Sequence, residues 1–199
     1  MSDLLAVPRA FGLPLAAAVL LAACGEDIVL PPPTQQVTAL EVSLYALTGT
    51  DVRTPSAYNM IIMLEIRTDE TTEFDFAFEI GIDSLLGVGT AGDTVAVLIP
   101  RGALGFTPDG GLQLASMPFD SILRAPLSGY EQLQPTVIRE GDVVLAASRL
   151  QQCNFNVIRP RVAKLRIDTI DLGQRSVAIH MVIDPNCGYL SLVPGLPSD

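Results

Sequence analysis

The chain has 199 residues, of which 49% are hydrophobic, and its formal net charge at pH 7 is −10. Because nearly half of the residues are apolar, this composition excludes a disordered chain over most of its length. The size is sufficient for one globular domain with a buried core. An acidic chain repels nucleic acid, whose phosphates bind clustered Lys and Arg, so we expect no nucleic-acid partner.

The acidic residues are concentrated in the first half of the chain. Residues 24–100 hold 12 acids and two bases, whereas residues 101–199 hold nine of each. Two interpretations are compatible with this asymmetry. The first half could present a surface for a cation or a cationic partner, or its carboxylates could lie on ordinary solvated strand faces, which is the interpretation we favour.

The chain begins with the parts of a secretory signal. Arg9 and the free amino terminus form a weakly positive region, diluted by Asp3, and an apolar run of 13 residues follows from Phe11 to Ala23. That run is too short to span a bilayer, which needs about 20 apolar residues. The alternatives are an uncleaved anchor helix or a buried core helix.

The apolar run ends in the sequence Leu-Ala-Ala-Cys, with the cysteine at position 24 and Gly25 after it. This sequence resembles the lipobox of bacterial lipoproteins, in which a peptidase cuts just before a cysteine that has been acylated on its sulfur. The resemblance implies a signal peptide at residues 1–23 and an anchor of three acyl chains on Cys24. Each buried methylene contributes about 0.8 kcal/mol, so three chains form an effectively permanent anchor.

The same resemblance implies a location. An Asp in the second position after the cut marks retention in the inner membrane of diderm bacteria, so Gly25 points to the outer membrane. Glu26 and Asp27 follow, and acidic residues there accompany surface display in some lineages. We therefore expect an exported protein on the periplasmic or surface face of the outer membrane. Its expected partners are the membrane, through the N-terminal lipid, and an envelope protein not identified by the sequence.

Residues 24–36 are predicted to form a lipid-anchored tether, because the three prolines at 31–33 favour an extended conformation of about 3.1 Å per residue. The folded domain is predicted at residues 37–199. Within it the dominant hydrophobic period is two, which indicates strands with one face in the core and one in water. The predicted strands are 40–45, 60–67, 74–83, 95–99, 143–150, 163–167, 177–183 and 189–192.

Gly- and Pro-containing turn signals at 107–111, 140–142 and 184–186 separate these runs. Many short strands with such turns predict an all-β, antiparallel, sandwich-like single domain, with a partly closed barrel as the variant. Residues 101–136 are the least periodic part. They are expected to form loops, one or two short strands and a helical turn near Phe119 to Leu123.

With Cys24 assigned to lipid, Cys153 and Cys187 remain, and an oxidising compartment favours a disulfide between them. The alternatives are two free thiols or half of a metal site, although zinc would need further ligands and the chain has one His. If strands 143–150, 162–167 and 176–183 form a meander, both cysteines lie beyond the same edge of the sheet. Closing that loop would stabilise the fold by roughly 3–4 kcal/mol.

The basic and imidazole side chains give no catalytic pattern. His180 lies in a predicted strand without a nucleophile motif nearby, so we interpret it as a surface or half-buried residue. Lys164 and Arg166, near Arg159 and Arg161, alternate with apolar residues and are predicted on a solvated strand face. There they could meet acidic partners or lipid headgroups, or pair with acidic strands of the first half.

Two groups of carboxylates are candidate calcium ligands, because calcium takes six to eight oxygen ligands, often from loops. Neither group has the spaced Asp-x-Asp-x-Asp-Gly pattern, and no nucleotide motif is present. We therefore expect no resident metal and no cofactor. The candidate residues are Asp69, Glu70, Glu73, Asp75, Asp168 and Asp171.

The leader, the tether and the strand pattern together favour a non-enzymatic envelope lipoprotein whose β-domain binds a partner or supports an assembly. The alternative is a lipid-anchored hydrolase or carbohydrate-binding module that uses carboxylates in the loops of residues 101–136. Sugars stack well on aromatic rings, so the absence of Trp argues mildly against sugar binding.

Overall fold

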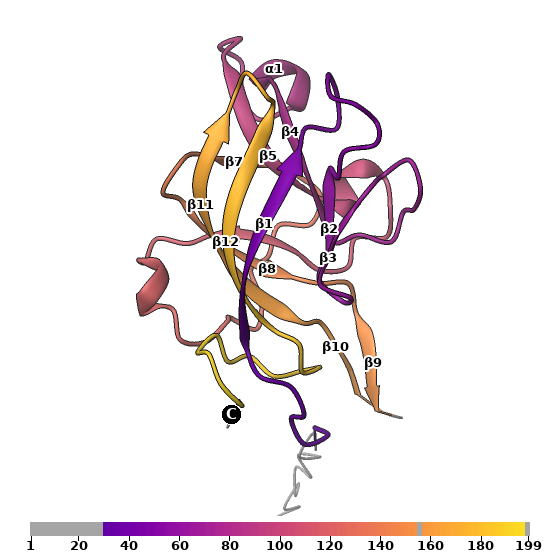
Figure 1. Cartoon of the computed structure of the whole chain (residues 1–199), viewed down its shortest axis with the longest axis vertical. Coiled ribbons are helices and arrows are strands. Elements are labelled where there is room, and N and C mark those ends of the chain that lie inside the picture. Colours follow the sequence, from indigo (N-terminus) through magenta and orange to yellow (C-terminus); the bar gives the residue numbers. More distant parts are fainter. Residues whose placement is uncertain (1–29, 155–156, 198–199) are drawn as a thin grey trace, which may run out of the picture.

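The computed structural model describes residues 30–154 and 157–197. In this part of the chain, twelve strands form two five-stranded antiparallel sheets and a separate hairpin (Figure 1). The predicted all-β, sandwich-like fold is therefore confirmed, and the sheets do not close into a barrel. The predicted signal peptide at 1–23 and the lipidation site Cys24 lie outside the described residues.

The first sheet has the strand order β1-β12-β11-β8-β6, the second sheet has the order β3-β2-β4-β5-β7, and β9 pairs with β10. Three short helical segments, α1, η1 and η2, lie in the connections. The bounds are β1 Thr38–Tyr45, β2 Ala57–Asn59, β3 Leu64–Ile66, β4 Phe76–Ile82, α1 Asp83–Leu86, β5 Thr94–Pro100, η1 Arg101–Leu104, β6 Gly111–Leu114, η2 Phe119–Ser121, β7 Thr136–Ile138, β8 Val143–Ala147, β9 Gln151–Asn154, β10 Val157–Arg159, β11 Val162–Asp171 and β12 Ser176–Asp184.

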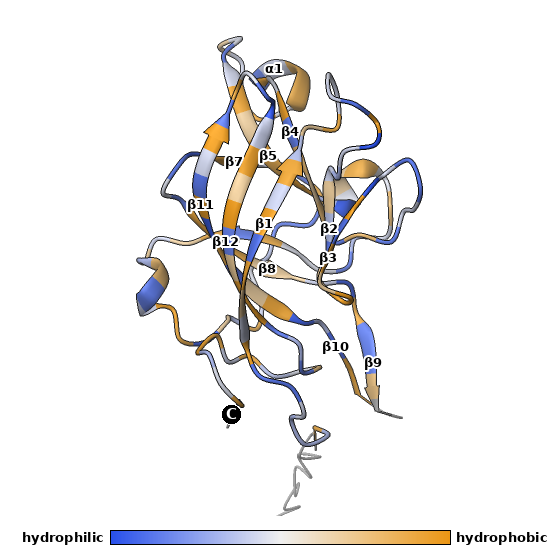
Figure 2. Ribbon diagram, in the orientation of Figure 1, coloured by the Kyte–Doolittle hydropathy of each residue, from blue (hydrophilic) through white to orange (hydrophobic). Residues whose placement is uncertain are grey.

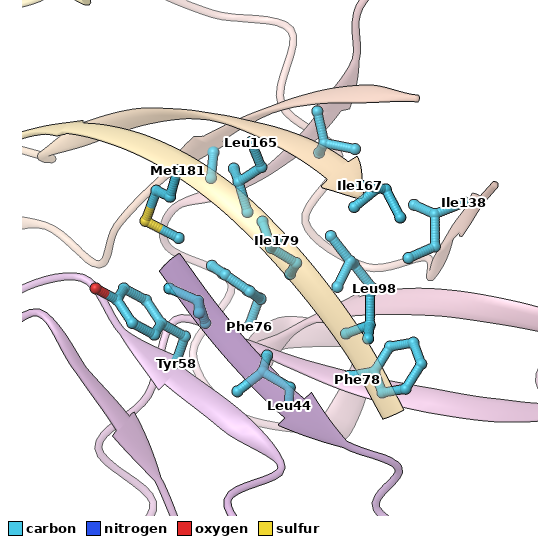
Figure 3. Packing of buried hydrophobic residues seen from close by; sticks show 14 of the residues in the cluster. Leu44, Tyr58, Phe76, Phe78, Leu98, Ile138, Leu165, Ile167, Ile179 and Met181 are labelled. Carbon is cyan, nitrogen blue, oxygen red and sulfur yellow. The ribbon is translucent and has the colours of Figure 1, made fainter. Parts of the chain in front are cut away.

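The main core lies between the two sheets. Alternate residues of β1, β11 and β12 face alternate residues of β4 and β5, as the period of two requires, and the alternation is visible along β1 in Figure 2. Figure 3 shows this layer from close by. Its fully buried large side chains include Leu44, Tyr58, Phe76, Phe78, Leu98, Leu165, Ile167, Ile179 and Met181.

The predicted meander is present, because β8 pairs antiparallel with β11 and β11 with β12. Both cysteines lie beyond the same end of these strands, and Cys153 and Cys187 form the predicted disulfide with a Cα–Cα distance of 5.3 Å. The sequence did not indicate that Cys153 lies in a hairpin of its own, formed by β9 and β10.

The prediction of one continuous strand over 60–67 is wrong. The chain turns at 60–63 between β2 and β3, which pair with each other. The side-chain oxygen of Asn59 accepts hydrogen bonds from the backbone N–H groups of Ile61 (2.9 Å) and Ile62 (3.2 Å), and Met63 has a φ of 54°. An Asn side chain that binds the backbone two residues on favours a turn, and here it overrides the alternating hydrophobic pattern.

The strand predicted over 74–83 exists as β4, but the prediction that one of its faces lies in water is wrong. Every residue from Phe74 to Ile80 is buried. Phe74 and Ala77 belong to a small cluster outside the main core, packed with Leu47 and Phe106. Both faces of this central strand are therefore covered, and its polar residues need internal partners.

The remaining differences are small. Residues 189–192 do not form a strand and contribute a single bridge, between Arg124 and Ser191. Residues 101–136 form loops with the short strand β6 and a helical turn at η2, as predicted. The first strand begins at Thr38, one residue after the predicted start of the domain.

The strand register defines two ends of the first sheet. Thr38, Ala147, Val162 and Asp184 lie together at one end, which we call the near end because the described chain enters the sheet there. The opposite end, which we call the far end, carries the β11–β12 turn. Figure 1 shows α1 at the far end and the C-terminal segment at the near end.

Candidate functional site

The Pro-rich segment 30–36 is bound to the near end through one side chain. The side-chain oxygen of Asn186 accepts hydrogen bonds from the backbone N–H groups of Thr34 (2.9 Å) and Gln35 (3.1 Å). Its amide nitrogen donates to the carbonyl oxygen of Gln35 (2.7 Å) and to Asp184 Oδ1 (2.8 Å). The Asn186 amide thus uses both its oxygen and its nitrogen to bind the backbone of residues 34–35.

Two further contacts hold the beginning of this segment. Tyr189 Oη donates to the carbonyl oxygen of Pro31 (3.1 Å). Leu30 lies over Gly188, where an added Cβ would be 2.6 Å from Leu30 Cδ2, and Gly188 has a φ of +87° that disfavours other residues. The segment that follows the predicted lipidation site is therefore packed against the sandwich from Leu30 onward.

A pocket of about 500 Å³ opens beside these contacts. It lies where β6, β8 and β11 reach the near end, and Gly110, Ala147 and Val162 are among its lining residues. Most of its lining residues are apolar, and the rest of the wall comes from the loop 126–132, the connection between β8 and β9, residues 158–160 and residues after β12. These include Pro126, Leu127, Tyr130, Leu150, Ile158, Arg159, Pro160, Gly188 and Leu190.

Tyr130 fixes the loop wall of this pocket. Its hydroxyl donates to the carbonyl oxygen of Pro126 at 3.0 Å, and burial raises its pKa to about 12. The phenol therefore stays protonated near neutral pH and keeps the loop 126–130 closed on itself. Arg159 is the only charged side chain among the described residues that line the pocket.

A buried ion pair joins the two sheets at the near end. Asp75, just before β4, accepts hydrogen bonds from the backbone N–H groups of Met60 (2.6 Å) and Arg149 (2.7 Å), and Arg149 Nε lies 3.2 Å from Asp75 Oδ1. The Arg149 guanidinium also pairs with Glu73. Burial raises the pKa of Asp75, and the hydrogen bonds and the charge of Arg149 oppose that shift. Glu79 is paired in a similar way with Arg175, at 2.9 Å.

Lys164 does not lie on a solvated face, so that prediction is wrong. The segment around η2 covers the outer face of the first sheet, and Lys164 is only 4% exposed. Its Nζ donates to the carbonyl oxygens of Phe119 (3.0 Å) and Ile122 (2.9 Å) and lies 4.5 Å from the Phe119 ring centre. Burial lowers its pKa, because the charged form loses hydration.

The only imidazole is half-buried on the same outer face, as interpreted from the sequence. His180 Nδ1 lies 2.6 Å from Glu41 Oε1 on the neighbouring strand, and its ring meets the edge of Phe119. The guanidinium of Arg166 lies over the Phe119 ring and pairs with Asp168. These contacts describe a packed cross-strand cluster.

The six candidate carboxylates for calcium lie apart in pairs or singly. Asp69 and Glu70 pair with Arg67 on an exposed turn, and Asp171 accepts the backbone N–H groups of the β11–β12 turn. Glu73 and Asp75 share Arg149, and Asp168 pairs with Arg166. Within the described residues, no group of three His, Cys, Asp or Glu side chains is arranged to hold a metal ion.

Sequence reasoning missed Asn186, Arg149 and the pocket. The turn signal Asp184-Pro185-Asn186 placed Asn186 in a turn. It did not show that the Asn186 side chain binds a segment about 150 residues earlier.

In the described part of the chain, no helix has the length and hydropathy needed to cross a membrane. Comparison with protein-family models gave no match, and comparisons with curated proteins and with solved structures found nothing similar to this chain.

Proposed function

We propose that this protein is an exported lipoprotein of the cell envelope. Its β-sandwich would be held at a membrane by lipid on Cys24 and serve as a non-enzymatic module for binding or assembly. The outer membrane is the location we propose, on either its periplasmic or its surface face. The proposal rests first on the sequence of the leader and the lipobox.

One structural observation supports the proposal most directly. The segment 30–36 is tied to the near end by Asn186 and Tyr189, so Leu30 is part of the folded unit. Leu30 is only six positions after Cys24. A lipid on that cysteine would therefore hold the sandwich close to the membrane, with the near end toward it and the far end away from it.

Of the three carboxylates in the loops of the hydrolase or sugar-binding alternative, Asp109 and Glu131 have partners within the domain, and Asp120 is exposed. Asp109 pairs with Arg101 at 3.0 Å. Glu131 accepts the backbone N–H groups of Leu133 and Gln134, and these bonds lower its pKa. Nothing in these loops favours the alternative over the binding module.

The decisive measurement is mass spectrometry of the mature amino terminus. We expect the mature chain to begin at a triacylated Cys24 and to partition into detergent. Cys24→Ala should abolish both properties while the domain still folds, because the described contacts begin at Leu30. An unmodified amino terminus, or an intact leader on membrane-bound protein, would refute the proposal.

The other two cysteines provide the matched control. The double variant Cys153→Ala, Cys187→Ala removes a bridge across 34 residues and should keep the lipid. Its free energy of unfolding should fall by roughly 3–4 kcal/mol, because the unfolded chain regains loop entropy. Loss of lipidation in this variant would show that processing depends on the fold and not on the leader.

A further inference from the structure

The pocket at the near end has an exposed apolar rim that its own fold does not cover. Leu127 is 85% exposed, Ile158 is 56% exposed and Leu150 is 53% exposed, and all three line the pocket. They come from separate segments of the chain, so the fold gathers them at one place. Contiguous apolar surface of this kind marks a site of contact with a protein or a membrane.

The position of Leu30 relative to this rim favours a membrane over a protein as the contact partner. Leu30 lies over Gly188, and an added Cβ there would also be 3.3 Å from Arg159 Cγ, so the first described residue touches the pocket wall. The six steps of chain from Cys24 to Leu30 span at most roughly 20 Å. A lipid on Cys24 would therefore keep Leu30, and the pocket wall at Gly188 that it contacts, within about that distance of a bilayer surface.

The charges agree with this orientation. Arg159 is the only charged residue among the described residues lining the pocket, and a guanidinium suits the phosphate of a lipid headgroup. The far end carries exposed carboxylates at Asp93, Glu140 and Asp171 beside the exposed Arg139, and Glu131 is exposed next to the pocket. An anionic bilayer would attract Arg159 and repel the carboxylates of the far end.

We propose that the rim formed by Leu127, Leu150 and Ile158 inserts into the surface of a phospholipid bilayer, with Arg159 at the level of the headgroup phosphates. This inference rests on the proposed lipid anchor and extends it. The anchor supplies proximity, and the rim fixes the orientation of the sandwich, with its far end presented away from the membrane.

The chain contains no Trp, so a single introduced Trp reports on its surroundings without background. The experiment uses the full-length lipidated protein in phosphatidylethanolamine–phosphatidylglycerol vesicles whose acyl chains carry bromine. Two variants, Leu127→Trp and Ile158→Trp, probe the rim. Leu85→Trp in α1 is the matched control, because Leu85 is 84% exposed and lies at the far end.

We expect a blue-shifted emission and bromine quenching for both rim variants and neither effect for Leu85→Trp, since interfacial groups lie about 5–10 Å deep. Adding Leu127→Asp to the Ile158→Trp protein should reduce the quenching, because a carboxylate opposes insertion. A blue shift without bromine quenching would mean that a second copy or residues 24–29 cover the rim, which would overturn the inference.

Flotation of the same vesicles separates the two proposals. If the protein does not float with the vesicles, the lipid anchor is wrong and the docking falls with it. If the protein floats and the rim variants are no more quenched than Leu85→Trp, the anchor stands and the docking alone is wrong.

Discussion

Charge is buried in two regions of this sandwich by different means. At the junction between the sheets, Asp75 forms an ion pair with Arg149 and accepts hydrogen bonds from the backbone N–H groups of Met60 and Arg149. On the outer face of the first sheet, Lys164 makes no ion pair in the described structure and is held by two carbonyl oxygens and an aromatic ring. The first arrangement leaves a buried charge if either partner is removed, whereas the second leaves only carbonyl groups.

Asp75→Asn should therefore have the largest effect. Removing one member of a buried pair typically costs about 3–5 kcal/mol, and in this variant Arg149 would keep only its pair with the largely exposed Glu73. We expect a loss of that size in the free energy of unfolding, measured by urea denaturation. The double variant Asp75→Asn, Arg149→Gln should lose less than the sum of the two single variants, because the groups are in contact.

Asp69→Asn is the control for that variant. Asp69 also pairs with an arginine, Arg67, but on the surface, where both side chains are about one-third exposed. Exposed pairs contribute little, so its unfolding curve should stay close to that of the natural chain. Equal losses of unfolding free energy in Asp69→Asn and Asp75→Asn would refute the expectation that the buried pair contributes more to stability than the exposed pair.

Lys164→Met should have an intermediate effect. Methionine fills a similar volume without a charge, and the carbonyl oxygens of Phe119 and Ile122 then lack their donor. Unsatisfied buried groups cost about 1–3 kcal/mol, and the avoided burial of the ammonium offsets part of this loss. A loss as large as that of Asp75→Asn would show that Lys164 behaves as one member of a charge pair.

The smallest expected effect is a dependence of stability on pH. Burial lowers the pKa of Lys164 in the folded state below its ordinary value of 10.5. Between these two pKa values the unfolded chain binds more protons than the folded chain, so the contribution of Lys164 to stability rises with pH. The difference in unfolding free energy between the natural chain and Lys164→Met should therefore increase as pH approaches 10.5. A difference that decreases over this range would contradict the sign of the shift.

The two regions also differ in how far they could be predicted. The alternation around Phe76 and Phe78 identified β4 and its inward face, because a period of two is a local property of the chain. The same alternation placed Asp75 and Glu79 in water, and it placed Lys164 there too. Both errors have one cause: the sequence pattern of a strand does not show that a second layer covers its other face.

The near end likewise has features that the sequence predicted and features that it did not. The pairing of Cys153 with Cys187 followed from the number of cysteines and from the meander, and it is confirmed. The sequence did not predict the hydrogen bonds between Asn186 and residues 34–35. It also did not predict the rim around Leu127 and Ile158. They join segments separated by up to about 150 positions, and no local pattern encodes which distant loops meet.

The sequence by itself determined the fold class, the meander of β8, β11 and β12, the disulfide and the expectation of a lipid on Cys24. Each of these depends on short-range periodicity, residue type or a compact motif. Only the tertiary structure decided that residues 60–63 turn, that Asp75 pairs with Arg149, that η2 covers Lys164 and that Leu30 lies against the pocket at the near end. These features depend on which surfaces pack together, because burial and the choice of hydrogen-bond partner are properties of the assembled layers.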